Sequence, residues 1–415
     1  MCTVPQTNAI GVTMTFLKSM AKRINENKQL TAFLLIALTL RLIFHLPFYL
    51  TSDLINYLNA LDAFSLRDLG DTMHIVRLGM ILPSALLNLA DFHYATVIYG
   101  LLTSLGTVWI TYRLGNAMGG SITAKIATSI VIFAPMDICL GPVFLPDGPL
   151  SFYALSSFYF TSRVVLEKDT KPIITLLAGL LIGIAYTCKV NALFFGIPAV
   201  FHLFFGLPHD RRWHLTTIFC LGVGIIIIGE SIILRALLGE WHIRIWETLG
   251  FISGSKGNHA TVDKTTFWWL EQIWFKVGAF LWGGHIPTAV MFSLIPHLYL
   301  GGLWKLRNRL KNHYGLLIWG LVWICQHMLI SPQEQEPRYM QVAIPFGALV
   351  VGLGFRSVWE SLSKKYKCTL LGGFICINLA CAGIFYATFS PISYAIENYI
   401  GQLKMLGENT YVDGP

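Results

Sequence analysis

Long apolar runs separated by short polar segments recur along most of the chain. A run such as LTTIFCLGVGIIIIGESIIL (215–234) has about the twenty residues that a helix needs to cross the hydrocarbon core of a membrane. It lacks the alternation of apolar and polar residues that is typical of a membrane β-strand. We therefore predict an all-α integral membrane protein with about eleven transmembrane helices, joined by helices that lie at the outer surface. The predicted spans are 30–50, 94–113, 121–139, 150–166, 172–188, 190–206, 215–236, 286–304, 314–331, 340–356 and 369–389.

The composition agrees with this prediction and excludes a nucleic-acid-binding protein. Hydrophobic residues make up 54% of the 415 residues and charged residues 13%, whereas soluble domains carry roughly 25% charged residues. The mean hydropathy is +0.60. The net charge of +8 comes from short Lys and Arg clusters between apolar runs, which is the pattern of topology signals. The eight cysteines form no CxxC pair, so we predict neither disulfides nor a zinc site.

The basic clusters also predict the orientation of the chain. If the segment 75–91 lies in the membrane interface instead of crossing it, all of these clusters fall on one side, which the positive-inside rule makes cytoplasmic. The clusters are Lys18/Lys22/Arg23/Lys28, Lys168/Lys171, Arg211/Arg212, Lys305/Arg307/Arg309/Lys311 and Lys364/Lys365/Lys367.

This topology divides the chain into three regions. Residues 1–29 are predicted to be a cytoplasmic N-terminal segment, and the first apolar run is a retained span rather than a cleaved signal peptide. Residues 30–389 form one multi-pass domain with outer loops 51–93 and 238–275, and residues 390–415 form a short outer-face tail. The Trp-rich loop 238–275 either closes over a substrate or anchors in the headgroup region.

Several polar side chains are predicted to meet at the outer face. Asn56 and Tyr57 share a face with Asp53 if that stretch is helical, and Asp147 in LPDGP lies at the start of the next helix. Lys189 joins two apolar segments, and EQEPRY precedes a late span. Each has a simpler alternative: Asp147 could cap its helix, Lys189 could extend to the headgroups, and Asp53 could be a solvated loop acid. Together, two acids and two cations suit a phosphate-bearing lipid and an attacking hydroxyl, because cations bind phosphate and a carboxylate can accept a proton.

The order of these motifs resembles a known superfamily. SDLINY, RLGMILPSALLNL, LPDGPLSFYALSSFYF, GIAYTCKVNALFF and EPRYMQVAIP are similar, in this order, to motifs of the polyprenyl-phosphate-dependent glycosyltransferases of the C superfamily. That group includes dolichyl-phosphate-mannose protein mannosyltransferases and lipid A aminoarabinose transferases. The resemblance covers about residues 30 to 356. It departs at Leu54, where many members have a second acid, and at Cys188, which interrupts the usual Thr-Lys pair.

The resemblance implies a glycosyltransferase that moves a sugar, with inversion, from a polyprenyl-phosphate donor to a hydroxyl of a surface glycan, lipid or protein. It implies that Asp53 is the general base or an acid that orients the acceptor, and that Asp147 is a second catalytic or acceptor-binding acid. The implied substrate-binding residues are Asn56, Tyr57, Lys189, Glu336, Arg338 and Tyr339, with Lys189 and Arg338 as phosphate ligands. No metal is expected to be required, and the site would face the periplasm or exterior of the cell membrane.

A transporter or flippase of lipid-linked sugars is the main alternative. Such a protein would show repeated halves and broken helices with polar groups near the bilayer midplane. We find no clear repeat, and the polar residues gather at one face, which favours an enzyme. A structural subunit, the third class, would need no convergent charged set.

Overall fold

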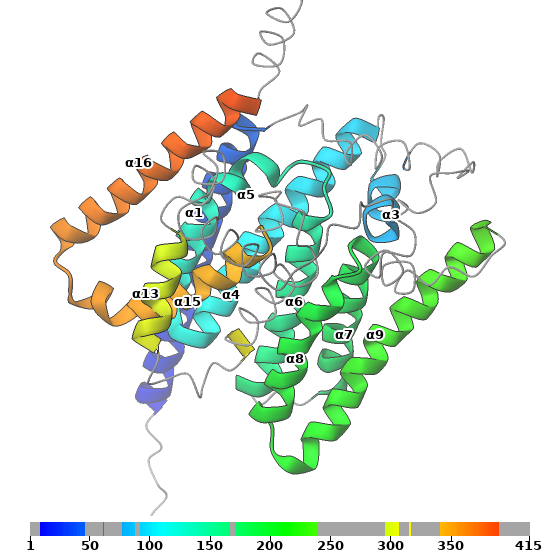
Figure 1. The fold of residues 1–415 in the computed structure, drawn as a ribbon. Helices are drawn as coiled ribbons and strands as arrows, with labels where there is room; N and C mark the ends of the chain where they lie inside the picture. Colours follow the sequence, from blue (N-terminus) through cyan, green and yellow to red (C-terminus); the bar gives the residue numbers. More distant parts are fainter. Residues whose placement is uncertain are drawn as a thin grey trace, which may run out of the picture.

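The computed structural model describes residues 9–45, 61, 77–87, 92–166, 171–238, 295–306, 315–316 and 341–389. These residues form helices and short connections (Figure 1), so the prediction of an all-helical protein is confirmed. The helices of the first half are α1 (Ala9–Ile43), α3 (Leu78–Leu86), α4 (Phe92–Phe133), α5 (Pro135–Leu140), α6 (Asp147–Leu166) and α7 (Pro172–Cys188). Those of the second half are α8 (Ala192–Gly206), α9 (His209–Leu238), α13 (Ile295–Leu306), α15 (Ala343–Ser361) and α16 (Lys364–Phe389).

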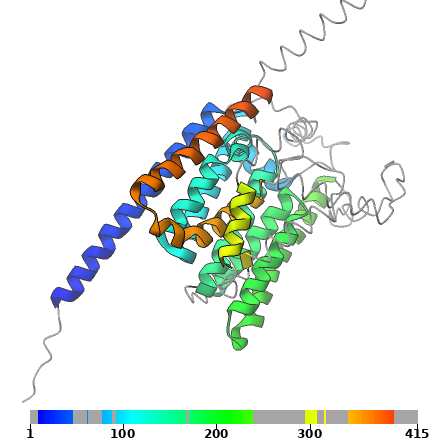
Figure 2. The same cartoon turned by 60° about the vertical axis from the view of Figure 1, so that its left-hand side comes forward.

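Helix α4 lies at the centre and packs against α1, α6 and α15. On one side α13 covers α15, and on the other α7 packs against α6 and α9, with α8 beside them (Figure 1). The N-terminal part of α1 extends beyond the bundle (Figure 2). Helix α1 begins at Ala9, so it runs through much of the segment that we predicted to precede the first span.

The element α4 consists of two arms that fold back on each other. Gly120 has a φ of 79°, in the left-handed region that glycine adopts without steric cost, and it is the only non-helical residue in the element. A Cβ on Gly115 would lie 2.8 Å from Cα of Ala124, although nine residues of straight helix would separate the two by about 13.5 Å. The chain therefore reverses at Gly120, as expected for two separate spans in this region.

Three of the described helices are long and apolar enough to cross a membrane: Tyr94–Phe133, His209–Leu237 and Lys364–Ala387. Two shorter apolar helices, Pro172–Cys188 and Ala192–Gly206, coincide closely with predicted spans. The number of about eleven stays a prediction. Helix α3 has nine residues, too few to cross a membrane, and the interfacial position of 75–91 stays a prediction.

Candidate functional site

The bundle has one end where several chain segments meet, which we call the site end. It is formed by the C-terminal end of α7, the first turns of α6, the helices α3 and α5, and the start of α15. Gly79 of α3 lies so close to Thr187 and Cys188 of α7 that a Cβ at position 79 would overlap both side chains. Gly100 of α4 is packed in the same way against the backbone of Pro142. Residues far apart in sequence are therefore held in close backbone contact here.

Asp147 and Lys189 form an ion pair at this end. The Lys189 ammonium donates to Oδ1 of Asp147 at 3.0 Å, and the side chains are 17% and 2% exposed. Asp147 is the first residue of α6, and Lys189 directly follows the last residue of α7. Two predicted site residues are thus brought together by the antiparallel packing of these helices.

This pairing decides between the alternatives for Asp147. A capping acid would accept from backbone N–H groups of the first turn. Instead, Oδ1 of Asp147 accepts from Lys189, and Oδ2 has no hydrogen-bond partner within the described parts of the chain. The second oxygen of a buried carboxylate is therefore available to a hydroxyl or another donor.

A second cation lies beside this pair. Arg77, the residue before α3, donates from Nη1 to the carbonyl of Cys188 at 2.8 Å, one residue before Lys189. Close by, the Tyr99 hydroxyl donates to the carbonyl of Gly79 at 2.7 Å and lies 3.4 Å from the Tyr153 hydroxyl. These contacts hold α3 over the end of α7 and place the Arg77 guanidinium at the residue before Lys189.

Asp137 of α5 is a third acid at the site end. Its Oδ1 accepts a hydrogen bond of 3.0 Å from Nε2 of Gln341, two residues before α15, and both side chains are buried. A Cβ on Gly148 would lie 3.8 Å from the same Nε2, so the Gln341 amide lies near the residue that follows Asp147.

Sequence reasoning missed Arg77, Asp137 and Gln341. Asp137 lies within the predicted span 121–139, and an acid inside an apolar run is a recognisable functional signal. Arg77 lies in the segment predicted to be interfacial, where a cation gives little signal by itself. Of the predicted site residues, Asp53, Asn56, Tyr57, Glu336, Arg338 and Tyr339 lie outside the described residues.

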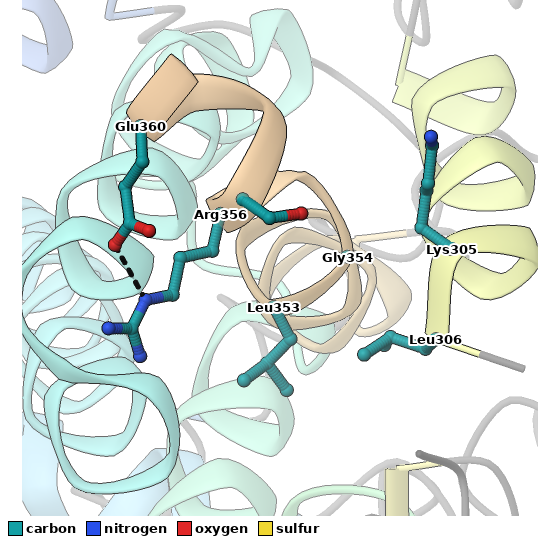
Figure 3. Close-up of a pocket in the computed structure, with 7 residues that line it drawn as sticks. Lys305, Leu306, Leu353, Gly354, Arg356 and Glu360 are labelled. Atoms are coloured by element: carbon teal, nitrogen blue, oxygen red, sulfur yellow. Dashed lines mark hydrogen bonds and ion pairs between the residues drawn. The ribbon is translucent and has the colours of Figure 1, made fainter. Parts of the chain in front are cut away.

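The end opposite the site holds the basic clusters that the structure describes. Helices α7 and α9 begin there, α13 ends there and α16 begins there, which places Lys171, Arg211, Arg212, Lys305, Lys364, Lys365 and Lys367 away from Asp147 and Lys189. A cavity of about 530 Å³ opens at this end, lined by Lys305, Leu306, Leu353, Gly354, Arg356, Ser357 and Glu360. Figure 3 shows Lys305 and the Arg356 guanidinium on opposite sides of Leu353, and Arg356 pairs with Glu360.

Metal ligation has no candidate within the described ranges, because no three His, Cys, Asp or Glu residues there are grouped so that they could hold an ion. The acids of the site end are instead paired with a lysine and an amide.

The comparison with protein families gives one match. The sequence profile described as dolichyl-phosphate-mannose-protein mannosyltransferase matches residues 84–234, which is less than half of the chain and includes both Asp147 and Lys189. The search of curated proteins finds no relative.

Solved structures show the same architecture. The oligosaccharyltransferase AglB from Archaeoglobus fulgidus, in complex with an inhibitory peptide and a dolichol-phosphate, has a TM-score of 0.57 at 10% identity. That match covers 89% of this chain and 56% of AglB. ArnT from Cupriavidus metallidurans bound to undecaprenyl phosphate has a TM-score of 0.55 at 14% identity, and the match covers 85% of this chain and 62% of ArnT.

The resemblance to glycosyltransferases of the C superfamily is confirmed. At these identities the structural matches establish the fold, and the chain spans little more than half the length of AglB. Together with the apolar helices, the family match also fits a protein of the membrane.

Proposed function

We propose that this chain is a membrane glycosyltransferase that moves a sugar from a polyprenyl-phosphate-linked donor to a hydroxyl of a cell-envelope acceptor, with inversion. The observation that carries the proposal is the buried Asp147–Lys189 pair, which lies beside Arg77 inside the segment matched by the mannosyltransferase profile. Two proteins of the same fold were solved with dolichol-phosphate and undecaprenyl phosphate.

The cations of the site supply what a leaving phosphate needs. When the bond between the anomeric carbon and the phosphate breaks, negative charge builds up on the phosphate oxygens, and fixed positive charges stabilise it. Lys189 is bound to Asp147, and Arg77 is bound to the carbonyl of Cys188, the residue before Lys189. We assign both to the donor phosphate, together with Arg338 and its neighbour Tyr339.

The acids take the acceptor. The attacking hydroxyl must lose one proton as it bonds to the anomeric carbon, and a carboxylate can accept that proton. In our proposal Asp53 is this base, Asp147 binds the acceptor through its second carboxylate oxygen, and Asn56, Tyr57 and Glu336 contact the substrates. Attack on the face opposite the phosphate then inverts the configuration at the anomeric carbon.

The distribution of charge supports an outer-face reaction. The described basic clusters lie at the end of the bundle opposite Asp147 and Lys189, and such clusters favour the cytoplasmic side of a membrane. In our proposal the chain crosses the cell membrane repeatedly, with the site facing the periplasm or exterior. The acceptor is accordingly a surface glycan, lipid or protein.

The proposal is tested by mass spectrometry of surface glycans and lipid A from cells that carry the wild type, Asp53→Asn, Asp147→Asn, Asp210→Asn or no protein. Asp210 is an exposed acid at the opposite end and serves as the matched control. We expect a mass increase of one sugar with the wild type and Asp210→Asn only, at equal protein levels in the membrane. Equal modification by Asp147→Asn and the wild type would contradict the role of the buried pair.

A flippase of lipid-linked sugars gives a different result in the same cells. In cells it would change which side of the membrane the lipid-linked sugar occupies. In vesicles that contain only the purified protein, donor and acceptor, it would add no sugar to the acceptor. Transfer by purified protein in vesicles that contain donor and acceptor therefore separates the two functions.

A further inference from the structure

A network of buried polar side chains lies at the site end. The proposed function assigns none of them to the donor phosphate or to the acceptor. Arg41 of α1 donates from Nε to the Ser104 hydroxyl of α4 and from Nη1 to the carbonyl of Ala37. The Arg41 charge also acts on the carboxylate of Asp137, which in turn accepts from Gln341. Four segments of the chain thus share one polar cluster.

The two charged residues of this cluster are almost completely buried. Arg41 is 0% exposed and Asp137 is 5% exposed. One guanidinium nitrogen of Arg41, Nη2, and one carboxylate oxygen of Asp137, Oδ2, have no hydrogen-bond partner within the described ranges. Apolar side chains of similar volume would pack at this depth at lower cost, and buried charges kept in spite of that cost often specify one arrangement of the chain.

This cluster lies where it can determine the position of the first residues of α6. The Gln341 amide lies near Gly148, the neighbour of Asp147, because a Cβ built there would be 3.8 Å from Nε2, and the same nitrogen donates to the Asp137 carboxylate. Gly141, on the connection from α5 to α6, fits directly against the Asp137 carbonyl and the Ser104 hydroxyl, where a Cβ would overlap both. The start of α6 therefore lies next to the Gln341 amide, and Gln341 is in turn bound to Asp137.

We propose that Asp137 and Gln341 are positioning residues, whose hydrogen bond holds the start of α6 so that Asp147 meets Lys189. Neither residue touches the reacting atoms in this proposal. The expected loss of donor binding rests on the proposed function, because Lys189 binds the donor phosphate only in that proposal. The expected weakening of the Asp147–Lys189 ion pair does not depend on the proposed function.

The Asp137–Gln341 hydrogen bond can be tested by exchanging its donor and acceptor with little change of shape. Asp and Asn have the same shape, as do Gln and Glu, so Asp137→Asn combined with Gln341→Glu keeps one acid and one amide but reverses the donor. The single change Gln341→Glu places two carboxyl groups in contact, which repel when both are ionised, and removes the amide N–H donor. Gln341→Leu removes it without adding charge, and Asp210→Asn is the control for an acid changed elsewhere.

The first readout is the reactivity of Lys189 toward an acetylating reagent, measured by mass spectrometry on full-length protein in lipid nanodiscs. Exposed Lys364 in the same molecule is the internal reference. We expect Lys189 to react roughly fivefold faster in Gln341→Glu and Gln341→Leu, the ratio that one ordinary hydrogen bond controls. The exchanged pair should return most of the way to the wild type.

The second readout is transfer with purified donor and acceptor. A positioning role predicts that the donor KM rises in Gln341→Leu more than kcat falls, and that the exchanged pair restores it. If Gln341→Leu does not fold, the comparison of Gln341→Glu with the exchanged pair still decides. Unchanged Lys189 reactivity in both single variants, or an exchanged pair no better than Gln341→Glu, would overturn the proposal. Absence of transfer in the wild type would refute the proposed function alone, because Lys189 reactivity is measured independently.

Discussion

Two ion pairs with the same separation lie at opposite ends of the bundle and differ in their surroundings. Lys189 and Asp147 meet at 3.0 Å with side chains 17% and 2% exposed. Arg356 and Glu360 also meet at 3.0 Å, one turn apart on α15, but they are 49% and 44% exposed (Figure 3). The first pair joins two helices, whereas the second lies on one.

The difference in burial determines what each pair can do. Water screens the charges of an exposed pair, so such a pair contributes about 0.3–0.5 kcal/mol when its members are four residues apart on a helix. A buried pair gains more from Coulomb attraction but has paid for desolvation, so the loss of one member leaves a costly isolated charge. Distance alone would rank the two sites equally, and burial separates them.

Removal of Lys189 should have the largest effect. Lys189→Met leaves the Asp147 carboxylate buried without its partner, which typically lowers the free energy of unfolding by about 3–5 kcal/mol. We expect the lower end of this range, since Lys189 is partly exposed, and loss of transfer. The double variant Asp147→Asn with Lys189→Met should recover most of the melting temperature in detergent but no transfer. Recovery of both would show that the pair is structural.

Arg77 tests whether the site end needs a second fixed cation. Arg77→Leu removes the bond from a charged donor to the Cys188 carbonyl, which is worth about 1.5–3 kcal/mol. We expect a lower melting temperature and a higher donor KM. Arg77→Lys keeps the charge and should bind donor better than Arg77→Leu. Equal donor KM in the two variants would exclude a role for the Arg77 charge.

Gly79 tests the close packing that brings α3 onto α7. Gly79→Ala forces a Cβ into Thr187 and Cys188, and such overpacking costs about 1–3 kcal/mol. Gly224→Ala in α9 is the matched control, because a Cβ there meets nothing within 4 Å. Thermal unfolding of the two variants should therefore differ. Identical melting temperatures would mean that α3 can move away from α7 without cost.

Glu360→Gln should have the smallest effect. Its partner Arg356 keeps the hydrogen bond of 2.7 Å to the Gly119 carbonyl, so only the exposed charge pair is lost. We expect a change of at most about 0.5 kcal/mol in unfolding free energy and unchanged transfer. A loss of transfer comparable to that of Lys189→Met would assign a function to the opposite end.

The sequence predicted the elements of the fold better than their limits. The run 172–188 is found as α7 with the same bounds, because a proline begins the helix and the apolar residues end with it. Helix α1 extends well before the predicted span, since helix formation does not require apolar side chains. Gly120 separates two spans that a continuous helical element would otherwise join.

By itself, the sequence determined that this chain is helical, apolar and charged at the ends of its helices, because these properties depend on local composition and period. It also singled out Asp147 and Lys189 as candidates. Only the tertiary structure decided that these two residues, 42 positions apart, form one pair, and that Asp137 meets Gln341 across 204 positions. Such contacts depend on which helix faces pack together and on how far the helices are shifted along their axes. The local sequence pattern determines neither.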